Sequence, residues 1–92
     1  MKDLNELIEV FTRVNSYEHM QKLFEELFTM KEKYDFALRW RLLKDLQKKI
    51  PQREIAQNLG ISLCKITRGS KILKEDDSIT RKLIEELNND QK

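Results

Sequence analysis

The sequence predicts an all-α protein, and three observations support this prediction. Apolar residues recur three or four positions apart along most of the chain, the spacing that places them on one side of a helix. Charged residues make up 37% of the 92 residues and fall between the apolar positions. Two glycines and one proline are few for a β-rich chain with many turns. We therefore expect a single helical domain that covers 1–92.

Four of the expected helices carry more apolar surface than one small domain covers. Their expected ranges are about 2–14, 16–28, 30–48 and 78–88. The second helix is expected to begin with a capping box at Asn15 and Glu18, and the third with a capping box at Thr29 and Glu32. Pro51 is expected to end the third helix. Two chains that pack these helices together would bury the apolar sides, so we expect a homodimer.

The segment 52–74 predicts two more short helices, joined by a tight turn. The first places three apolar residues on one side, namely Ile55, Ala56 and Leu59. Gly60 follows, where a left-handed residue commonly ends a helix, and Ser62 can cap the next one. The expected inward residues of that second helix are Leu63, Ile66 and Leu73. This pattern is typical of a helix-turn-helix, whose second helix enters the DNA major groove.

Positive charge is concentrated on the same segment. Residues 48–74 contain seven basic residues and one acidic residue, a net charge of about +6, whereas the whole chain carries only +2. The rest of the chain is therefore acidic. A concentrated basic surface favours binding to a phosphate backbone, because binding releases condensed counterions.

Gly69 lies in the middle of the second short helix, where it costs roughly 1 kcal/mol relative to alanine. A branched aliphatic residue here would fix the helix to its core, so its absence predicts a slot along the helix. Arg68 stands beside this slot, and Arg39 on the third helix can face it. Two guanidinium groups suit a flat ring that bears a carboxylate. The alternatives are that Gly69 admits a neighbouring backbone and that the arginines are solvated or ion-paired.

These residues resemble the tryptophan repressor family. The resemblance rests on Gln52-Arg53-Glu54, on Ile66-Thr67-Arg68-Gly69-Ser70 and on Leu73-Lys74, and it extends more loosely back to Leu27. It implies an intertwined six-helix homodimer that binds L-tryptophan as corepressor. The dimer would then occupy double-stranded operator DNA of tryptophan biosynthesis genes and block transcription initiation.

The resemblance also implies roles in a tryptophan site. Arg39 is similar to the arginine that holds the ligand carboxylate, and Arg68 to the one that stacks on the indole. Gly69 lines the indole slot, and Thr29 lies at the opposite wall. Ile72 belongs to the same site but departs from the family pattern, since it stands where the best-known members have a serine near the ligand's amino group.

A second set of roles concerns DNA. Arg53 resembles the arginine that reaches a guanine. The other residues that the resemblance places near bases or phosphates are Gln52, Ser62, Cys64, Lys65, Thr67 and Lys74.

The sequence contains no pattern typical of an enzyme or of a metal site, so we expect neither catalysis nor a bound metal. No apolar run is long enough to span a membrane, and the lone Cys64 suits a reducing compartment, so we expect a cytoplasmic protein. Two other interpretations remain open. One is a DNA-binding regulator of the same fold whose slot is empty or takes another effector. The other is a helical module that binds an acidic protein.

Overall fold

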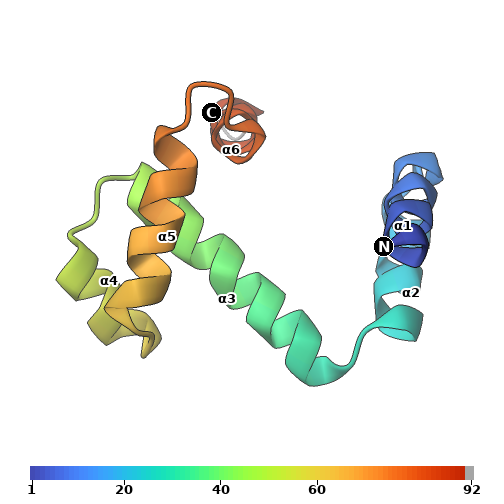
Figure 1. Cartoon of the computed structure of the whole chain (residues 1–92), viewed down its shortest axis with the longest axis horizontal. Coiled ribbons are helices and arrows are strands. Elements are labelled where there is room, and N and C mark those ends of the chain that lie inside the picture. The colour runs from blue at the N-terminus through green and yellow to red at the C-terminus, as the bar shows by residue number, and fades with distance from the viewer. Residues whose placement is uncertain (91–92) are drawn as a thin grey trace. The chain divides into compact units, whose positions relative to one another are not determined.

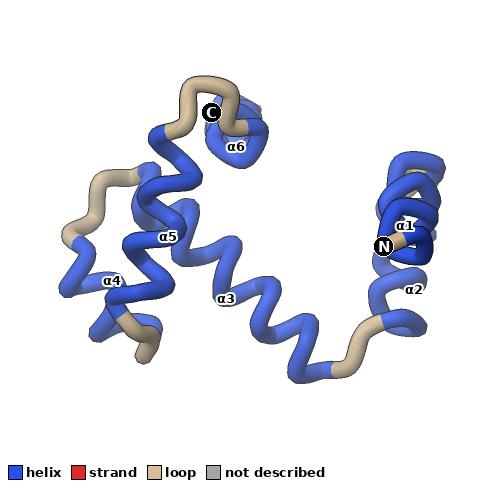
Figure 2. The backbone as a smooth tube through the Cα atoms, in the orientation of Figure 1, coloured by secondary structure: helices blue, strands red, loops and turns tan. Residues whose placement is uncertain are grey.

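The computed structural model describes residues 1–90, and all regular elements in that range are helices (Figures 1 and 2). In chain order they are α1 (Lys2–Arg13), α2 (Tyr17–Leu27), α3 (Met30–Gln47), α4 (Gln52–Leu59), α5 (Leu63–Lys74) and α6 (Ile79–Asp90). The all-α prediction is confirmed. Each predicted helix boundary lies within two residues of the observed one.

The chain divides into two compact units, Met1–Tyr34 and Asp35–Lys92. The boundary falls within α3, so the first unit holds α1, α2 and the start of α3. The second unit holds the rest of α3 with α4, α5 and α6. The expectation of one domain over 1–92 stays a prediction.

In the first unit, α1 and α2 meet through three phenylalanines. The ring centroid of Phe11 lies 5.9 Å from that of Phe24 and 6.3 Å from that of Phe28, and the Phe24 and Phe28 rings meet edge to face at 5.1 Å. Aromatic pairs prefer such offset and edge-on arrangements. No residue of this unit is fully buried, because two short helices cannot enclose a core by themselves.

The caps of α2 and α3 test the two predicted capping boxes. For α2 the prediction was wrong, because the N-cap is Ser16, whose hydroxyl accepts the His19 N–H at 3.0 Å. Since the N-cap is Ser16 and not Asn15, the third helical position is His19, and Glu18 falls one position short of closing a capping box. For α3 the prediction is confirmed: the Thr29 hydroxyl accepts the Glu32 N–H at 3.1 Å, and the Glu32 carboxylate accepts the Thr29 N–H at 2.9 Å.

The core of the second unit consists of two clusters on two sides of α3. Leu42 packs with Ile55 of α4 and Ile66 of α5. Leu43 packs with Leu73 of α5 and Ile84 of α6. Adjacent positions on a helix point about 100° apart, so the Leu42-Leu43 pair lets α3 serve both clusters, and α5 contributes to each. In Figure 1, α5 accordingly crosses the later part of α3.

Helix α5 ends where Arg81 of α6 reaches back to it. The guanidinium group donates hydrogen bonds to the Leu73 and Glu75 carbonyls, both at 2.8 Å, and to the Asp76 carbonyl at 2.9 Å. The carbonyls at the end of a helix lack intrahelical partners, and a cation there also opposes the helix dipole. Ser78 caps α6 by accepting the Arg81 N–H at 3.1 Å. These contacts fix the turn between α5 and α6.

Candidate functional site

The start of α5 is built as the sequence predicted. Gly60 adopts φ 64° and ψ 37°, a left-handed conformation that glycine adopts at least cost. The Ser62 hydroxyl then accepts the Lys65 N–H at 3.4 Å and caps α5. One inward residue was predicted wrongly: Leu63 is 51% exposed. The neighbouring Ile61, in the turn, packs against the core instead.

The buried side of α5 consists of Ile66, Gly69 and Leu73. A Cβ atom added to Gly69 would lie 3.1 Å from Leu46 Cδ1 and 3.3 Å from Leu43 Cδ2. The prediction that the missing side chain leaves an open slot was therefore wrong, because leucine side chains of α3 fill that space. Gly69 lets α5 approach α3 closely. The alternative that Gly69 admits a neighbouring part of the protein describes the structure better than an open slot does. The neighbouring atoms belong to leucine side chains and not to a backbone.

The opposite side of α5 is exposed and cationic. All residues predicted to lie near DNA are exposed, namely Gln52, Arg53, Ser62, Cys64, Lys65, Thr67 and Lys74. Arg68 and Lys71 are exposed as well, and α5 has no acidic residue in its first turn. The positive end of the helix dipole and the Lys65 side chain thus act together at the start of α5, whereas Lys71 and Lys74 lie in its last turn.

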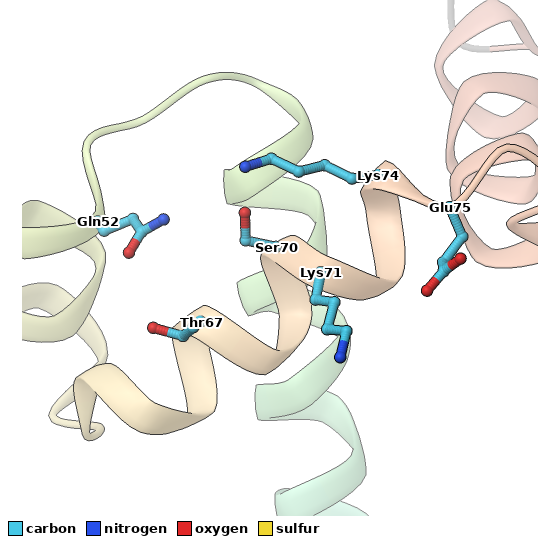
Figure 3. A pocket seen from close by; sticks show the side chains of 6 residues that line it. All are labelled: Gln52, Thr67, Ser70, Lys71, Lys74 and Glu75. Atoms are coloured by element: carbon cyan, nitrogen blue, oxygen red, sulfur yellow. The ribbon is translucent and has the colours of Figure 1, made fainter.

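A pocket of about 440 Å³ lies between the start of α4 and α5. Gln52, Thr67, Ser70, Lys71, Lys74 and Glu75 line it. In Figure 3 the side chains of Gln52, Thr67, Ser70 and Lys74 point into this space, whereas Lys71 and Glu75 point toward the other side of α5. The pocket brings together three of the predicted DNA-binding residues, and Arg53, Ser62, Cys64 and Lys65 do not line it.

A second pocket, of about 460 Å³, lies between the later turns of α5 and the start of α6. Its lining consists of Arg68, Lys71, Ile72, Glu75, Asp77, Ser78, Ile79 and Thr80. Cationic, anionic and apolar side chains therefore meet in one cavity. We call it the α5–α6 pocket.

The family model described as Trp repressor protein matches residues 2–88. The chain belongs to the Trp repressor family. This family is a family of regulators, and the chain shares its all-helical fold.

Relatives named Trp operon repressor homolog support the assignment to the Trp repressor family. One from Chlamydia caviae is 31% identical over 84 residues, which cover 90% of this chain and 83% of the relative. One from Chlamydia trachomatis serovar L2 is 34% identical and covers 72% of this chain and 71% of the relative. A third, from Mannheimia succiniciproducens, reaches 49% identity over 55 residues, which cover 59% of this chain and 54% of the relative. No solved structure matches the chain.

The structure brings together two of the five residues that the Trp repressor resemblance assigned to the ligand. Arg68 and Ile72 line the α5–α6 pocket. Gly69 faces the leucines of α3, and Arg39 is an exposed residue of α3 outside that lining. Thr29 belongs to the first unit, where its hydroxyl caps α3. Ligand binding by each of these residues stays a prediction.

Sequence reasoning missed Ser70 and Lys71 in the lining between α4 and α5. Ser70 follows Thr67 by three positions, so helical spacing places it on the same side of α5 as that predicted residue, and this spacing was the signal that would have found it. Lys71 points toward the other side of α5, and no comparable signal in the sequence indicated it. Among residues 1–90, no three His, Cys, Asp or Glu side chains are grouped to hold a metal ion. In the same range, none of the helices has the length and apolarity that crossing a bilayer requires.

Proposed function

We propose that this Trp repressor family member is a transcriptional repressor that binds operator DNA as a homodimer, with L-tryptophan as its corepressor, in the cytoplasm. One observation carries the DNA-binding part. Helix α5 buries Ile66, Gly69 and Leu73, and it exposes its basic side chains. A basic helix fixed to its core by the opposite side is what major-groove binding requires.

The residues at the start of α4 and α5 are suited to distinct contacts. The Ser62 oxygen accepts a hydrogen bond within the cap, which leaves its O–H free to donate to a phosphate. Lys65, in the first turn of α5, adds positive charge at that end of the helix. Arg53 in the first turn of α4 is exposed and can bind guanine O6 and N7 with both arms of its guanidinium group.

The homodimer is supported by apolar side chains that this chain leaves exposed. Leu4 and Ile8 of α1 are 52% and 53% exposed, and Tyr34 of α3 is 65% exposed. Among the apolar residues of α6, Ile79, Leu83 and Leu87 are also exposed. A second copy would cover such residues. Twofold symmetry would also present the α5 helices of the two copies, as recognition helices, to successive major grooves about 34 to 36 Å apart.

Corepression by L-tryptophan is supported by the α5–α6 pocket. At about 460 Å³ it falls within the usual size range of small-molecule sites, and it contains Arg68 and Ile72. Within this pocket we assign Arg68 to the indole ring, and we assign Arg39, which lies outside the lining, to the ligand carboxylate as the family resemblance implies. L-Tryptophan shifts the protein toward its DNA-binding conformation only to the extent that it binds this conformation more tightly than the others. A tenfold preference contributes about 1.4 kcal/mol per site.

A second candidate is a regulator of the same fold that does not respond to tryptophan. Two observations favour it: leucine side chains fill the space beside Gly69, and Ile72 offers no hydroxyl group to an amino group. This candidate shares the DNA-binding surface and differs only in the effector.

A DNA-binding assay with and without L-tryptophan separates the two candidates. Duplexes selected by the purified protein from a random-sequence pool would serve as probes. We expect tighter binding with L-tryptophan and a steep loss of affinity as salt rises, because phosphate contacts release counterions. Equal binding with and without L-tryptophan would favour the second candidate. Binding that is weak and insensitive to salt would contradict both.

A further inference from the structure

The α5–α6 pocket has a lining that fits an amino acid. Arg68 and Lys71 supply positive charge to the lining, and Glu75 and Asp77 supply negative charge. Ile72 and Ile79 are apolar. An apolar zwitterion carries the complementary groups, namely a carboxylate, an ammonium group and a hydrophobic side chain. The combination of all three lining types in one cavity, and not the acids alone, indicates this class of ligand.

The ammonium group needs a hydrogen-bond acceptor, and position 72 cannot provide one, because isoleucine has no polar side-chain atom. An ammonium group that loses water without a new partner costs binding free energy. Two other side chains in the lining offer hydroxyl groups, but the buried Ser78 already uses its oxygen to cap α6. Thr80 has a neutral hydroxyl group. Carboxylates are the stronger acceptors for a cation.

Glu75 and Asp77 are available for this task. Within residues 1–90, neither carboxylate group takes part in an ion pair or a side-chain hydrogen bond. The backbone that carries them is nevertheless fixed, since Arg81 binds the carbonyls of Leu73, Glu75 and Asp76. Acceptors on a fixed backbone lose less conformational entropy when a ligand binds.

We propose that Glu75 and Asp77 bind the α-amino group of the amino-acid corepressor and thereby replace the serine contact that Ile72 removes. The inference rests on the proposed function, because it assigns one group of the same ligand. The two carboxylates make the pocket bind an amino acid more tightly than an analogue that has the same ring and a carboxylate but no amino group.

Isothermal titration of the full chain with L-tryptophan and with indole-3-propionate tests the inference. Indole-3-propionate keeps the ring and the carboxylate but lacks the amino group. For the wild-type protein we expect about tenfold tighter binding of L-tryptophan, the effect of a hydrogen bond to a charged group. For the Glu75→Gln/Asp77→Asn double variant we expect nearly equal binding of the two ligands. Its affinity for indole-3-propionate should be retained or improved, which also reports that the variant is folded.

Asp76→Asn is the matched control, because it removes one charge from the same turn at a residue outside the pocket lining. It should leave the ratio of the two affinities unchanged. A double variant that keeps the wild-type ratio while it binds both ligands would overturn the inference and leave the proposed function intact. A wild-type protein that binds both ligands equally would do the same. If the wild-type protein binds neither ligand, the corepressor part of the proposed function fails, and the inference fails with it.

Discussion

At the scale of single residues, Gly69 shows how one missing side chain can have two explanations. A glycine in the middle of a helix costs roughly 1 kcal/mol relative to alanine, so the sequence indicates that something needs the space. It does not indicate whether a ligand or the protein itself takes that space. In the structure the protein itself takes that space, because a Cβ atom at position 69 would lie 3.1 Å from Leu46 Cδ1 of α3.

Substitution of Gly69 distinguishes close packing from an open slot. In Gly69→Ala, the gain in helix propensity of about 1 kcal/mol is offset by crowding against Leu43 and Leu46. We expect the free energy of unfolding to change by less than about 1 kcal/mol. In Gly69→Val the larger side chain meets the same leucines, and we expect a loss of at least about 2 kcal/mol. Urea unfolding at one protein concentration measures both.

An open slot would give the opposite pattern for Gly69. Alanine would then stabilise the protein by about 1 kcal/mol, and valine would be tolerated without repacking. Lys71→Ala provides a control on the exposed side of α5, where neither crowding nor a glycine is involved. Its effect on unfolding should be small, because exposed substitutions on a helix seldom exceed about 0.5 kcal/mol.

At the scale of elements, the ends of helices were predictable where the side chain itself forms the cap. Ser62, Gly60 and the pair Thr29 and Glu32 act as expected, because their function follows from residue type and spacing. The position of the end of α3 was predicted within one residue, but its cause was not, since Pro51 was expected to end the helix and α3 ends at Gln47, before a left-handed residue. Lys49 adopts φ 67°, the one non-glycine residue with positive φ among residues 1–90. Its N–H binds the Leu46 carbonyl at 3.0 Å, and the Ile50 N–H binds the Asp45 carbonyl at 3.2 Å. This is the hydrogen-bond pattern of a Schellman motif, which usually contains glycine.

Lys49→Gly should stabilise the protein. A left-handed conformation costs a non-glycine residue about 1 to 2 kcal/mol, and the greater freedom of glycine in the unfolded chain cancels part of this gain. We expect an increase of about 0.5 to 1 kcal/mol in the free energy of unfolding, measured by urea denaturation.

Lys48→Gly is the matched control for Lys49→Gly, since it removes the same charge from the adjacent position. Lys48 has no positive φ, and its N–H still binds the Lys44 carbonyl at 3.0 Å. Glycine there only adds freedom to the unfolded chain, so the control should be neutral or destabilised. Equal stabilisation by both substitutions would mean that relief of charge repulsion, and not backbone conformation, is responsible.

At the scale of the whole molecule, the helices and the basic surface of α5 were predictable from periodicity and charge. The grouping of side chains in the α5–α6 pocket was not. Asp77 and Ile79 join Arg68 there because Arg81 fixes the turn at the end of α5. Such an arrangement depends on tertiary hydrogen bonds, which leave no periodic signal in the sequence. For the same reason, spacing alone could not show that Leu42 and Leu43 serve two different clusters.

The last prediction concerns the exposed apolar residues of α1. Leu4 and Ile8 lie one helical turn apart and are 52% and 53% exposed, so a second copy that covers them would gain the free energy of burying both side chains. Leu4→Gln/Ile8→Gln should therefore shift the protein from dimer toward monomer in sedimentation equilibrium. Its thermal midpoint should fall, since loss of the partner removes stabilisation by mass action. Val10→Gln is the control, because Val10 is 39% exposed on another side of α1. A wild-type protein that is monomeric at high concentration, with a midpoint independent of concentration, would contradict the homodimer and with it the paired recognition helices.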